Sequence, residues 1–170
     1  MNTIYKKAEL LANIAIIVVA ILLCFVVAKR FVLSPKESNS AAEFKEVSAG
    51  EKISLPDVDW TNSDKTLLVV IEKGCHFCSD SAAFYRRLVQ ETTGRKNVKL
   101  VAVFPHGVDQ GKEYLNGLGV QITELRQASF NSIKVRGTPT LILVNNAGVV
   151  TDTWLGQLPP DKESELLSRL

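Results

Sequence analysis

The longest uninterrupted apolar stretch of the chain lies near its beginning, at residues 10–28. It contains no charged residue, and Asn13 is its only strongly polar side chain. A helix over this stretch would be roughly 28 Å long, which matches the hydrocarbon core of a bilayer. The pattern therefore predicts a transmembrane helix at 10–28, preceded by an N-terminal flank at 1–9.

Two other interpretations of residues 10–28 are a buried core helix and a cleaved signal peptide. A core helix needs apolar neighbours on all sides, and no other segment is apolar enough to surround it. A signal peptide has a shorter apolar region, roughly 7 to 15 residues, and a small-residue cleavage site. Lys29 and Arg30 follow here instead. Cys24 is preceded by Leu23, which does not fit a lipoprotein signal, so we expect Cys24 to be an apolar membrane residue. An uncleaved signal anchor is the better interpretation.

Basic residues flank the anchor on both sides and nearly balance, with Lys6 and Lys7 before it and Lys29 and Arg30 after it. The positive-inside rule therefore gives little indication of which side of the membrane each end of the chain lies on. The free N-terminal amine and the long C-terminal part favour a single-pass protein of the cell membrane. Its globular domain is then expected outside the cytoplasm, on the periplasmic or outer face.

Residues 29–43 are expected to form a linker, because they include a polar, small-residue stretch with a single proline. The remainder, 44–170, has alternating apolar and polar segments that predict one globular domain. The whole chain is 46% hydrophobic and 22% charged, with a formal net charge of +2. So small a charge argues against nucleic acid as a partner.

Two short, continuous apolar runs at 66–72 and 97–104 predict buried strands of a parallel type. Between them, residues 79–93 have apolar side chains at helical spacing, and Gly94 follows as a stop. A strand, a helix and a strand in succession predict an α/β layered fold with a crossover connection.

The C-terminal half continues with further elements of both kinds. A helix is expected at 108–118, interrupted by glycines at its end. Two apolar runs at 140–144 and 149–155, separated by turn residues, predict a β-hairpin. An amphipathic helix beginning at Pro160 closes the chain. Trp60 and Trp154 are expected to be core or rim aromatics.

The candidate chemistry is a Cys-x-x-Cys pair, Cys75 and Cys78, at the junction of the first strand and the following helix. A helix N-terminus favours a thiolate over a thiol, so Cys75 is the candidate nucleophile. Cys78 lies one turn further on and is the candidate resolving thiol. Half of a zinc site is an alternative, but it needs two more ligands. A static structural disulfide is another alternative, although so small a loop constrains an unfolded chain little.

The motif GCHFC after a strand, together with VRGTPTLILVNNAG at 135–148, resembles the thioredoxin superfamily, and within it the membrane-anchored TlpA/ResA-like thiol-disulfide oxidoreductases. The resemblance covers about 65–170 and implies a thioredoxin-like fold, a central mixed sheet flanked by helices. It also implies that Pro139 is a cis proline beside the cysteine pair and that Thr138 offers backbone hydrogen bonds to a substrate. An ordinary trans proline is the alternative.

The site also departs from the thioredoxin pattern. Gly74 and Phe77 stand where thioredoxins usually have Trp and Pro, so Phe77 is expected to modulate the site. The family's buried acid would fall on Val69. Glu72 is the only nearby substitute as a proton acceptor, with a solvated charge at the end of the strand as the alternative.

His76 lies between the two cysteines, which resembles the Cys-Pro-His-Cys motif of strongly oxidising DsbA-type proteins, though in the other interior position. Its imidazole could stabilise the Cys75 thiolate and raise the reduction potential of the pair. A solvent-facing loop residue is the alternative. His106 is expected to be a loop residue outside the site.

These expectations combine into a membrane-anchored, extracytoplasmic thiol-disulfide oxidoreductase that acts on cysteines of exported proteins. No metal or organic cofactor is expected beyond the redox-active Cys75–Cys78 disulfide. The anchored layout favours a reductase supplied by an integral-membrane electron carrier, for example in cytochrome c maturation. His76 favours the alternative of an oxidase or isomerase. A non-catalytic module that binds a protein partner or copper is the alternative from a different class.

Overall fold

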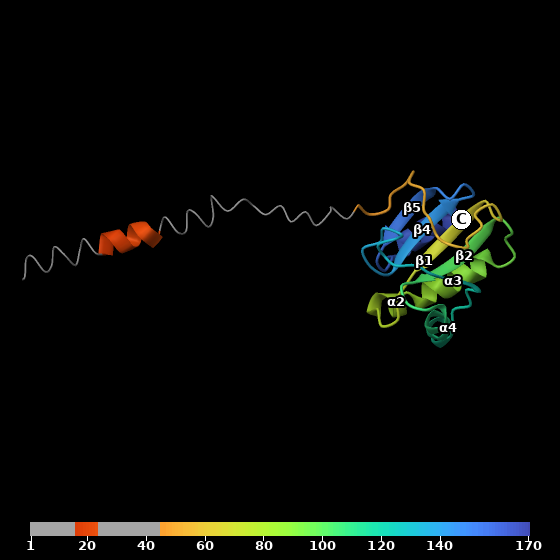
Figure 1. Cartoon of the computed structure of the whole chain (residues 1–170). Helices are drawn as coiled ribbons and strands as arrows, with labels where there is room; N and C mark the ends of the chain where they lie inside the picture. Colours follow the sequence, from red (N-terminus) through yellow and green to blue (C-terminus); the bar gives the residue numbers. More distant parts are fainter. Residues whose placement is uncertain (1–15, 24–44) are drawn as a thin grey trace, which may run out of the picture. The chain divides into compact units, whose positions relative to one another are not determined.

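The structure, a computed structural model, describes residues 16–23 and 45–170 (Figure 1). The chain divides into two compact units, Met1–Glu43 and Phe44–Leu170. In the first unit residues 16–23 are helical. Across the described ranges, no helix combines the length and the apolar character that a membrane crossing requires. Most of the helix expected at 10–28, and all of the linker expected at 29–43, lies outside the described residues.

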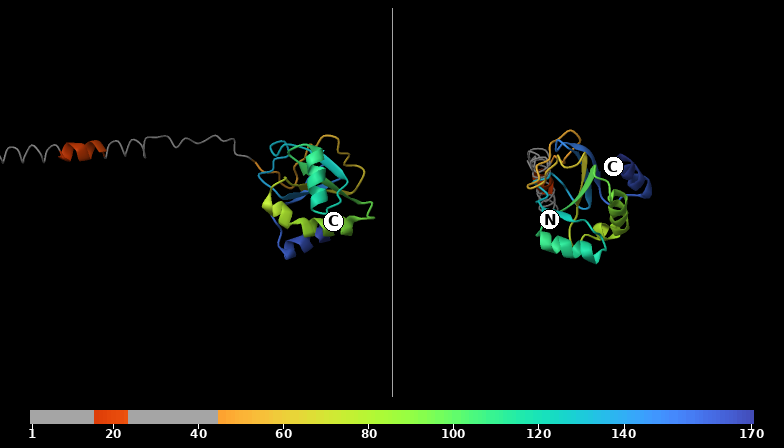
Figure 2. Two further views of the ribbon diagram at one scale, coloured as in Figure 1. Left: turned by 90° about the horizontal axis from the view of Figure 1, so that it is seen from below. Right: turned by 90° about the vertical axis from the view of Figure 1, so that its right-hand side faces the viewer.

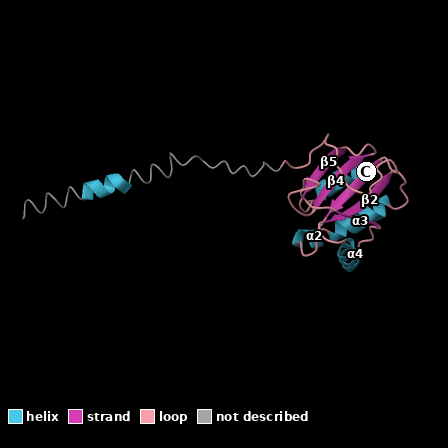
Figure 3. Ribbon diagram, in the orientation of Figure 1, coloured by secondary structure: helices cyan, strands magenta, loops and turns pink. Residues whose placement is uncertain are grey.

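A five-stranded mixed sheet forms the centre of the second unit (Figure 3). Its strands are β1 (Lys65–Val70), β2 (Val98–Phe104), β3 (Glu124–Gln127), β4 (Thr140–Asn145) and β5 (Val150–Leu155). They lie in the order β3-β2-β1-β4-β5. β1 pairs parallel with β2, and β2 pairs parallel with β3. β4 runs antiparallel to both β1 and β5. The expected hairpin is thus confirmed as β4 and β5.

Four helices accompany the sheet, namely α2 (His76–Asp80), α3 (Ala82–Thr92), α4 (Val108–Gly117) and α5 (Pro160–Arg169). α3 connects β1 to β2, as the helical spacing of its apolar residues predicts. α3 and α5 lie side by side (Figure 2). The single helix expected at 79–93 begins earlier and is divided at Ser81 into α2 and α3. β3 is short and only partly buried, and its sequence carries no strand pattern that distinguishes it from a loop.

The two faces of the sheet carry two separate apolar cores, because side chains alternate along each strand. On one face Leu67 and Val69 of β1 pack with residues of α3, α4 and α5, including Tyr85 and Leu166. On the other face Leu68 and Val70 pack against the segments 47–55 and 128–135. The cysteine pair belongs to the helical face, where Cys78 is wholly buried.

Both tryptophans contribute to these cores. Trp154 of β5 is buried on the helical face, and Trp60 packs at the margin of the other core. The expectation of core and rim aromatics is therefore confirmed.

Candidate functional site

The site lies at the carboxyl end of β1, where the chain leaves the sheet and enters α2. Gly74 has φ +89°, a left-handed conformation that residues other than glycine rarely adopt. The backbone N–H of Cys75 donates to the carbonyl oxygen of Glu72 at 3.2 Å. This turn makes Cys75 the N-cap of α2. The placement of the first cysteine at a helix start is therefore as predicted.

The sulfur of Cys75 has partners on both sides. It accepts a hydrogen bond from the backbone N–H of Cys78 at 3.4 Å. As a thiol it donates to the carbonyl oxygen of Thr138 at 3.3 Å. The residue is half-buried, so the sulfur is held between two chain segments while part of it faces solvent.

The surroundings of Cys75 favour its ionisation. Burial alone would raise its pKa, but hydrogen bonds outweigh that effect and hold the pKa below the usual range. The side chains of Cys78 and Thr138 and the backbone N–H groups of Cys78 and Phe77 supply these bonds. The bond from the thiol to the carbonyl of Thr138 acts the other way, because it is made only by the protonated form.

Cys78 differs sharply from Cys75. It is wholly buried, and burial is the main cause that raises its pKa to about 12. The neighbouring sulfur of Cys75 adds to the increase. Both cysteines are free thiols in this structure. The pair therefore consists of one accessible, acidified thiol and one buried thiol that stays protonated at neutral pH.

Thr138 and Pro139 come from the loop before β4, far from the cysteines in sequence. Their peptide bond is cis, as the resemblance implies. The carbonyl oxygen of Pro139 accepts from the N–H of Gly156 at 2.7 Å, which ties the loop to the end of β5. Thr140 Oγ1 donates to the carbonyl of Gly137 at 2.7 Å and braces the same loop. The segment that faces Cys75 is thus held by the β4–β5 hairpin.

His76 does not take the position beside the sulfur on which its expected role depends. Its Nε2 lies 3.1 Å from Oδ2 of Asp80, one turn along α2, and its side chain is 81% exposed. The imidazole is therefore paired with a carboxylate on the solvent side of the helix. Phe77 is also largely exposed, at 55%, and its ring is tilted against that of His76.

Glu72 and His106, which the sequence interpretation separated, lie together. Oε1 of Glu72 is 3.3 Å from Nε2 of His106 in the loop after β2. Neither motif nor spacing relates these residues. They meet because β1 and β2 are parallel neighbours, so the loops that follow them emerge at the same edge of the sheet.

Two tyrosines near the cysteines were missed by the sequence reasoning. The hydroxyl of Tyr114 on α4 is 3.0 Å from that of Ser79 on α2. Tyr85 on α3 is 1% exposed, and its hydroxyl has no hydrogen-bond partner among the described residues. The available signal for Tyr85 was its position seven residues after Cys78, which is the same face of a continuous helix.

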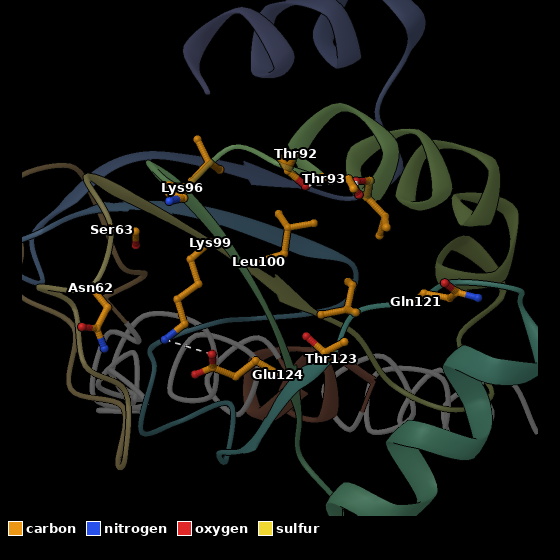
Figure 4. Close-up of a pocket in the computed structure, with 13 residues that line it drawn as sticks. Asn62, Ser63, Thr92, Thr93, Lys96, Lys99, Leu100, Gln121, Thr123 and Glu124 are labelled. Atoms are coloured by element: carbon orange, nitrogen blue, oxygen red, sulfur yellow. Dashed lines mark hydrogen bonds and ion pairs between the residues drawn. The ribbon is translucent and has the colours of Figure 1, made fainter.

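Several cavities of the described domain lie away from the cysteines. One of about 430 Å³ lies at the opposite end of the sheet, where β2 and β3 begin (Figure 4). Its polar lining includes Thr92, Lys96 and the ion pair of Lys99 with Glu124, whose charged atoms are 2.9 Å apart. Within the part of the chain that the structure describes, no cluster of three or more His, Cys, Asp or Glu residues could hold a metal ion.

Sequence comparisons give no relative, since neither a family model nor a curated protein matches the chain. Solved structures do match. A protein of Chlorobium tepidum, described as a candidate thiol:disulfide interchange protein DsbE, is similar at a TM-score of 0.56 and 20% identity, over 74% of this chain and 96% of that one. A thiol-disulfide isomerase from Corynebacterium glutamicum is similar at a TM-score of 0.54 and 14% identity, over 77% of this chain and 97% of that one. StoA from Bacillus subtilis is similar at a TM-score of 0.53 and 17% identity, over 71% of this chain and 93% of that one.

These likenesses show the fold of the second unit. It is a mixed α/β, thioredoxin-like fold with a five-stranded sheet flanked by helices, as the resemblance in the sequence implies.

Proposed function

We propose that the chain is a thiol-disulfide oxidoreductase in which Cys75 attacks and Cys78 resolves. The observation that carries the proposal is the asymmetry of the pair. Cys75 is accessible and has a lowered pKa, whereas Cys78 is buried and has a raised one. A thiolate is the reactive form in disulfide exchange, so only Cys75 is prepared to make the first attack.

The reaction proceeds in two exchanges. The Cys75 thiolate forms a bond to one sulfur of a substrate disulfide, and the other substrate sulfur leaves with the bonding electron pair and takes up a proton. Cys78 then attacks Cys75, its proton passes to the departing substrate sulfur, and the Cys75–Cys78 disulfide forms. The substrate disulfide gains two electrons and the cysteine pair loses two. The reverse sequence oxidises a dithiol substrate.

The loop before β4 provides the surface against which a substrate is held. The carbonyl of Thr138 already accepts a hydrogen bond from Cys75, and the ring of Phe77, two residues after Cys75, is 55% exposed. Leu155, 53% exposed, ends β5 opposite Thr140, the residue that follows Pro139. Exposed apolar side chains on the two chain segments that carry the accessible thiol and its neighbouring loop suit an extended cysteine-containing segment.

The proposed setting is the membrane, with residues 10–28 as a signal anchor and the domain on the extracytoplasmic side. Cysteine-containing exported proteins are the proposed substrates, and an integral-membrane electron carrier is the proposed source of electrons. The likeness to the protein described as a DsbE candidate supports thiol:disulfide interchange as the reaction, since that is the activity its name gives. No metal or organic cofactor is needed, because the two sulfurs hold the electrons.

We favour the reductive direction, with a role such as cytochrome c maturation. The argument for an oxidase rested on contact between His76 and the Cys75 sulfur, and the imidazole is paired with Asp80 instead. A reductase requires a potential near that of thioredoxin, about −270 mV, and far from the roughly −120 mV of the strongest oxidant of the superfamily.

The test is disulfide trapping in cells that express the full-length chain. Cys78→Ser should accumulate mixed disulfides between Cys75 and exported proteins, visible as adducts that a reductant releases. Cys75→Ser is the matched control and should accumulate none. Adducts through Cys78 in the Cys75→Ser variant would reverse the assignment of roles. Absence of adducts from both variants, with no turnover of a model disulfide, would leave a binding module as the function.

A further inference from the structure

α2, the helix that Cys75 caps, has little apolar packing of its own. It is five residues long, and Cys78 is its only buried residue. His76 and Phe77 are exposed. A helix this short is unstable by itself, because nucleating the first turn costs more than so few hydrogen bonds return. α2 therefore depends on contacts with other elements, and those contacts decide how firmly its first turn is held.

One such contact comes from α4. The hydroxyl oxygens of Ser79 on α2 and Tyr114 on α4 are 3.0 Å apart. The Ser79 hydroxyl also donates to the carbonyl oxygen of Cys75, at 3.3 Å. A serine hydroxyl has only one proton, so Tyr114 is the donor in the contact with Ser79. The phenol, the serine hydroxyl and the carbonyl of Cys75 thus form a chain of two hydrogen bonds that ends on the backbone of the candidate nucleophile.

The donor of this chain is carried by a helix that is packed firmly on the sheet. Tyr114 is half-buried and packs against the same apolar core as Cys75. The next residue, Leu115, is buried, and Gly111 lies directly against the ring of Phe104. Burial raises the pKa of Tyr114, and the cysteine sulfurs add to the increase, so the phenol keeps its proton at neutral pH. α4 therefore presents a stable hydrogen-bond donor to α2.

The carbonyl and the sulfur of Cys75 are both bonded to the first turn of α2. The carbonyl accepts from the backbone N–H of Ser79 at 3.2 Å, and the sulfur accepts from the backbone N–H of Cys78 at 3.4 Å. Both bonds require the same backbone conformation over residues 75–79, so a contact that stabilises the first also preserves the second. A hydrogen bond from an N–H group favours a thiolate over a thiol. The contact with α4 therefore bears on the ionisation of Cys75.

We propose that Tyr114 is a positioning residue that acts through Ser79 to hold the first turn of α2, and with it the N–H of Cys78 at the Cys75 sulfur. The inference rests on the proposed function, in which Cys75 makes the first attack. Tyr114 exchanges no proton and no electron, so the balance of the disulfide exchange is unchanged. Its effect is a larger thiolate fraction of Cys75 at neutral pH than α2 would support without the phenol.

The test is the pH dependence of Cys75 alkylation by iodoacetamide in the reduced full-length chain. Mass spectrometry with fragmentation distinguishes modified Cys75 from modified Cys78. Tyr114→Phe removes the hydroxyl and keeps the ring, so the midpoint of the rate profile should move to higher pH. Below the midpoint the rate should fall roughly threefold, which is the size of effect that one hydrogen bond supports. Ser79→Ala should move the profile in the same direction, whereas Ser79→Thr keeps a hydroxyl and should retain most of the rate.

Glu113→Gln is the matched control on the same helix. The Glu113 carboxylate is 3.6 Å from Nζ of Lys73, and both side chains are largely exposed, so loss of this ion pair should cost little. The profile of Glu113→Gln should not move to higher pH. If it moves as far as that of Tyr114→Phe, the effect belongs to α4 in general and the proposal is overturned.

A double variant tests whether Tyr114 acts through Ser79. In a Ser79→Ala chain, Tyr114→Phe should have no further effect, because the two hydroxyls belong to one chain of hydrogen bonds. A shift that persists undiminished in the Ser79→Ala chain would overturn the proposal, and so would an unmoved profile in Tyr114→Phe. A lower melting temperature with an unmoved profile would show a purely structural role, which also overturns it.

The readout needs no protein substrate, so the two proposals can fail separately. The proposed function fails if Cys78→Ser traps no adducts and the chain turns over no model disulfide. The role of Tyr114 fails if the alkylation profile of Cys75 does not respond to the phenol hydroxyl, whether or not exported proteins are trapped.

Discussion

The thiol of Cys75 donates a hydrogen bond to the backbone carbonyl of Thr138 at 3.3 Å, although 63 positions separate the two residues. The contact joins the start of α2 to the loop before β4. β1 and β4 are antiparallel neighbours, so the end of β1 and the start of β4 lie at the same edge of the sheet. Any segment that exchanges disulfides with Cys75 must approach beside this loop.

The side chain of Thr138 should influence the reactivity of Cys75. Thr138→Ala removes a side-chain hydrogen bond that lowers the Cys75 pKa, so that pKa should rise. Alkylation of Cys75 at pH 7 should slow severalfold, as measured by mass spectrometry of the peptide that carries it. Thr138→Ser keeps a hydroxyl at the same position and should retain most of the rate. Equal effects of the two substitutions would assign the change to the loop backbone.

The stability of the reduced protein should fall in alkaline solution. The folded pKa of Cys78 is about 12, above the ordinary thiol value of 9.0, mainly because of burial. Between these two pH values the folded state keeps a proton that the unfolded state has lost. The raised pKa therefore contributes to the free energy of unfolding, and this contribution to stability is fully present below pH 9. It should disappear as the pH rises toward 12.

The oxidised protein is the control for that measurement, because a disulfide has no proton to lose. Urea unfolding between pH 8 and pH 10.5 should show a steeper loss of free energy for the reduced form than for the oxidised form. Parallel curves for the two forms would contradict the raised pKa of Cys78.

His76 should contribute little to the redox poise. Its imidazole is exposed and paired with Asp80, so His76→Ala should leave the reduction potential of the cysteine pair unchanged. Equilibration with glutathione buffers measures this potential. Asp80→Asn, which removes the partner of the imidazole, is the companion variant and should also leave it unchanged. A potential lowered by tens of millivolts in His76→Ala alone would restore the role that the sequence suggests.

Gly111 on α4 should tolerate no side chain. A Cβ atom there would lie within 2.7 Å of three ring carbons of Phe104, a buried residue of β2. Gly111→Ala should therefore cost about 1–3 kcal/mol and several degrees of melting temperature, as overpacking does. Gly117→Ala in the same helix meets nothing within 4 Å and should cost nothing. Thermal unfolding of the two variants under the same conditions compares their melting temperatures and tests this expectation.

The catalytic candidates could be predicted because they are local. A strand, a glycine turn and a Cys-x-x-Cys at a helix start are consecutive in the chain, and the loop with Pro139 carries its own motif. The contacts of His76 and Glu72 could not be predicted in the same way. His76 has a carboxylate four residues ahead on its own helix, and that local pairing prevails over the sulfur. Glu72 meets His106 only through the parallel pairing of β1 and β2.

The sequence by itself determined the strands β1, β2, β4 and β5, most helices and the positions of the two sulfurs, because hydrophobic periodicity and turn residues act over a few neighbouring positions. β3 could not be predicted from the sequence, since it is defined by its pairing with β2 and its own residues are half-exposed. The sequence also indicated Cys75 as the acidified thiol, from its place at a helix start. Only the tertiary structure decided that Cys78 is wholly buried and which groups lower the pKa of Cys75. Those properties depend on Thr138 from a distant loop and on a core assembled from both halves of the domain. The electrostatic environment of a side chain depends on the groups packed around it, so two residues close together in the sequence can have very different pKa values.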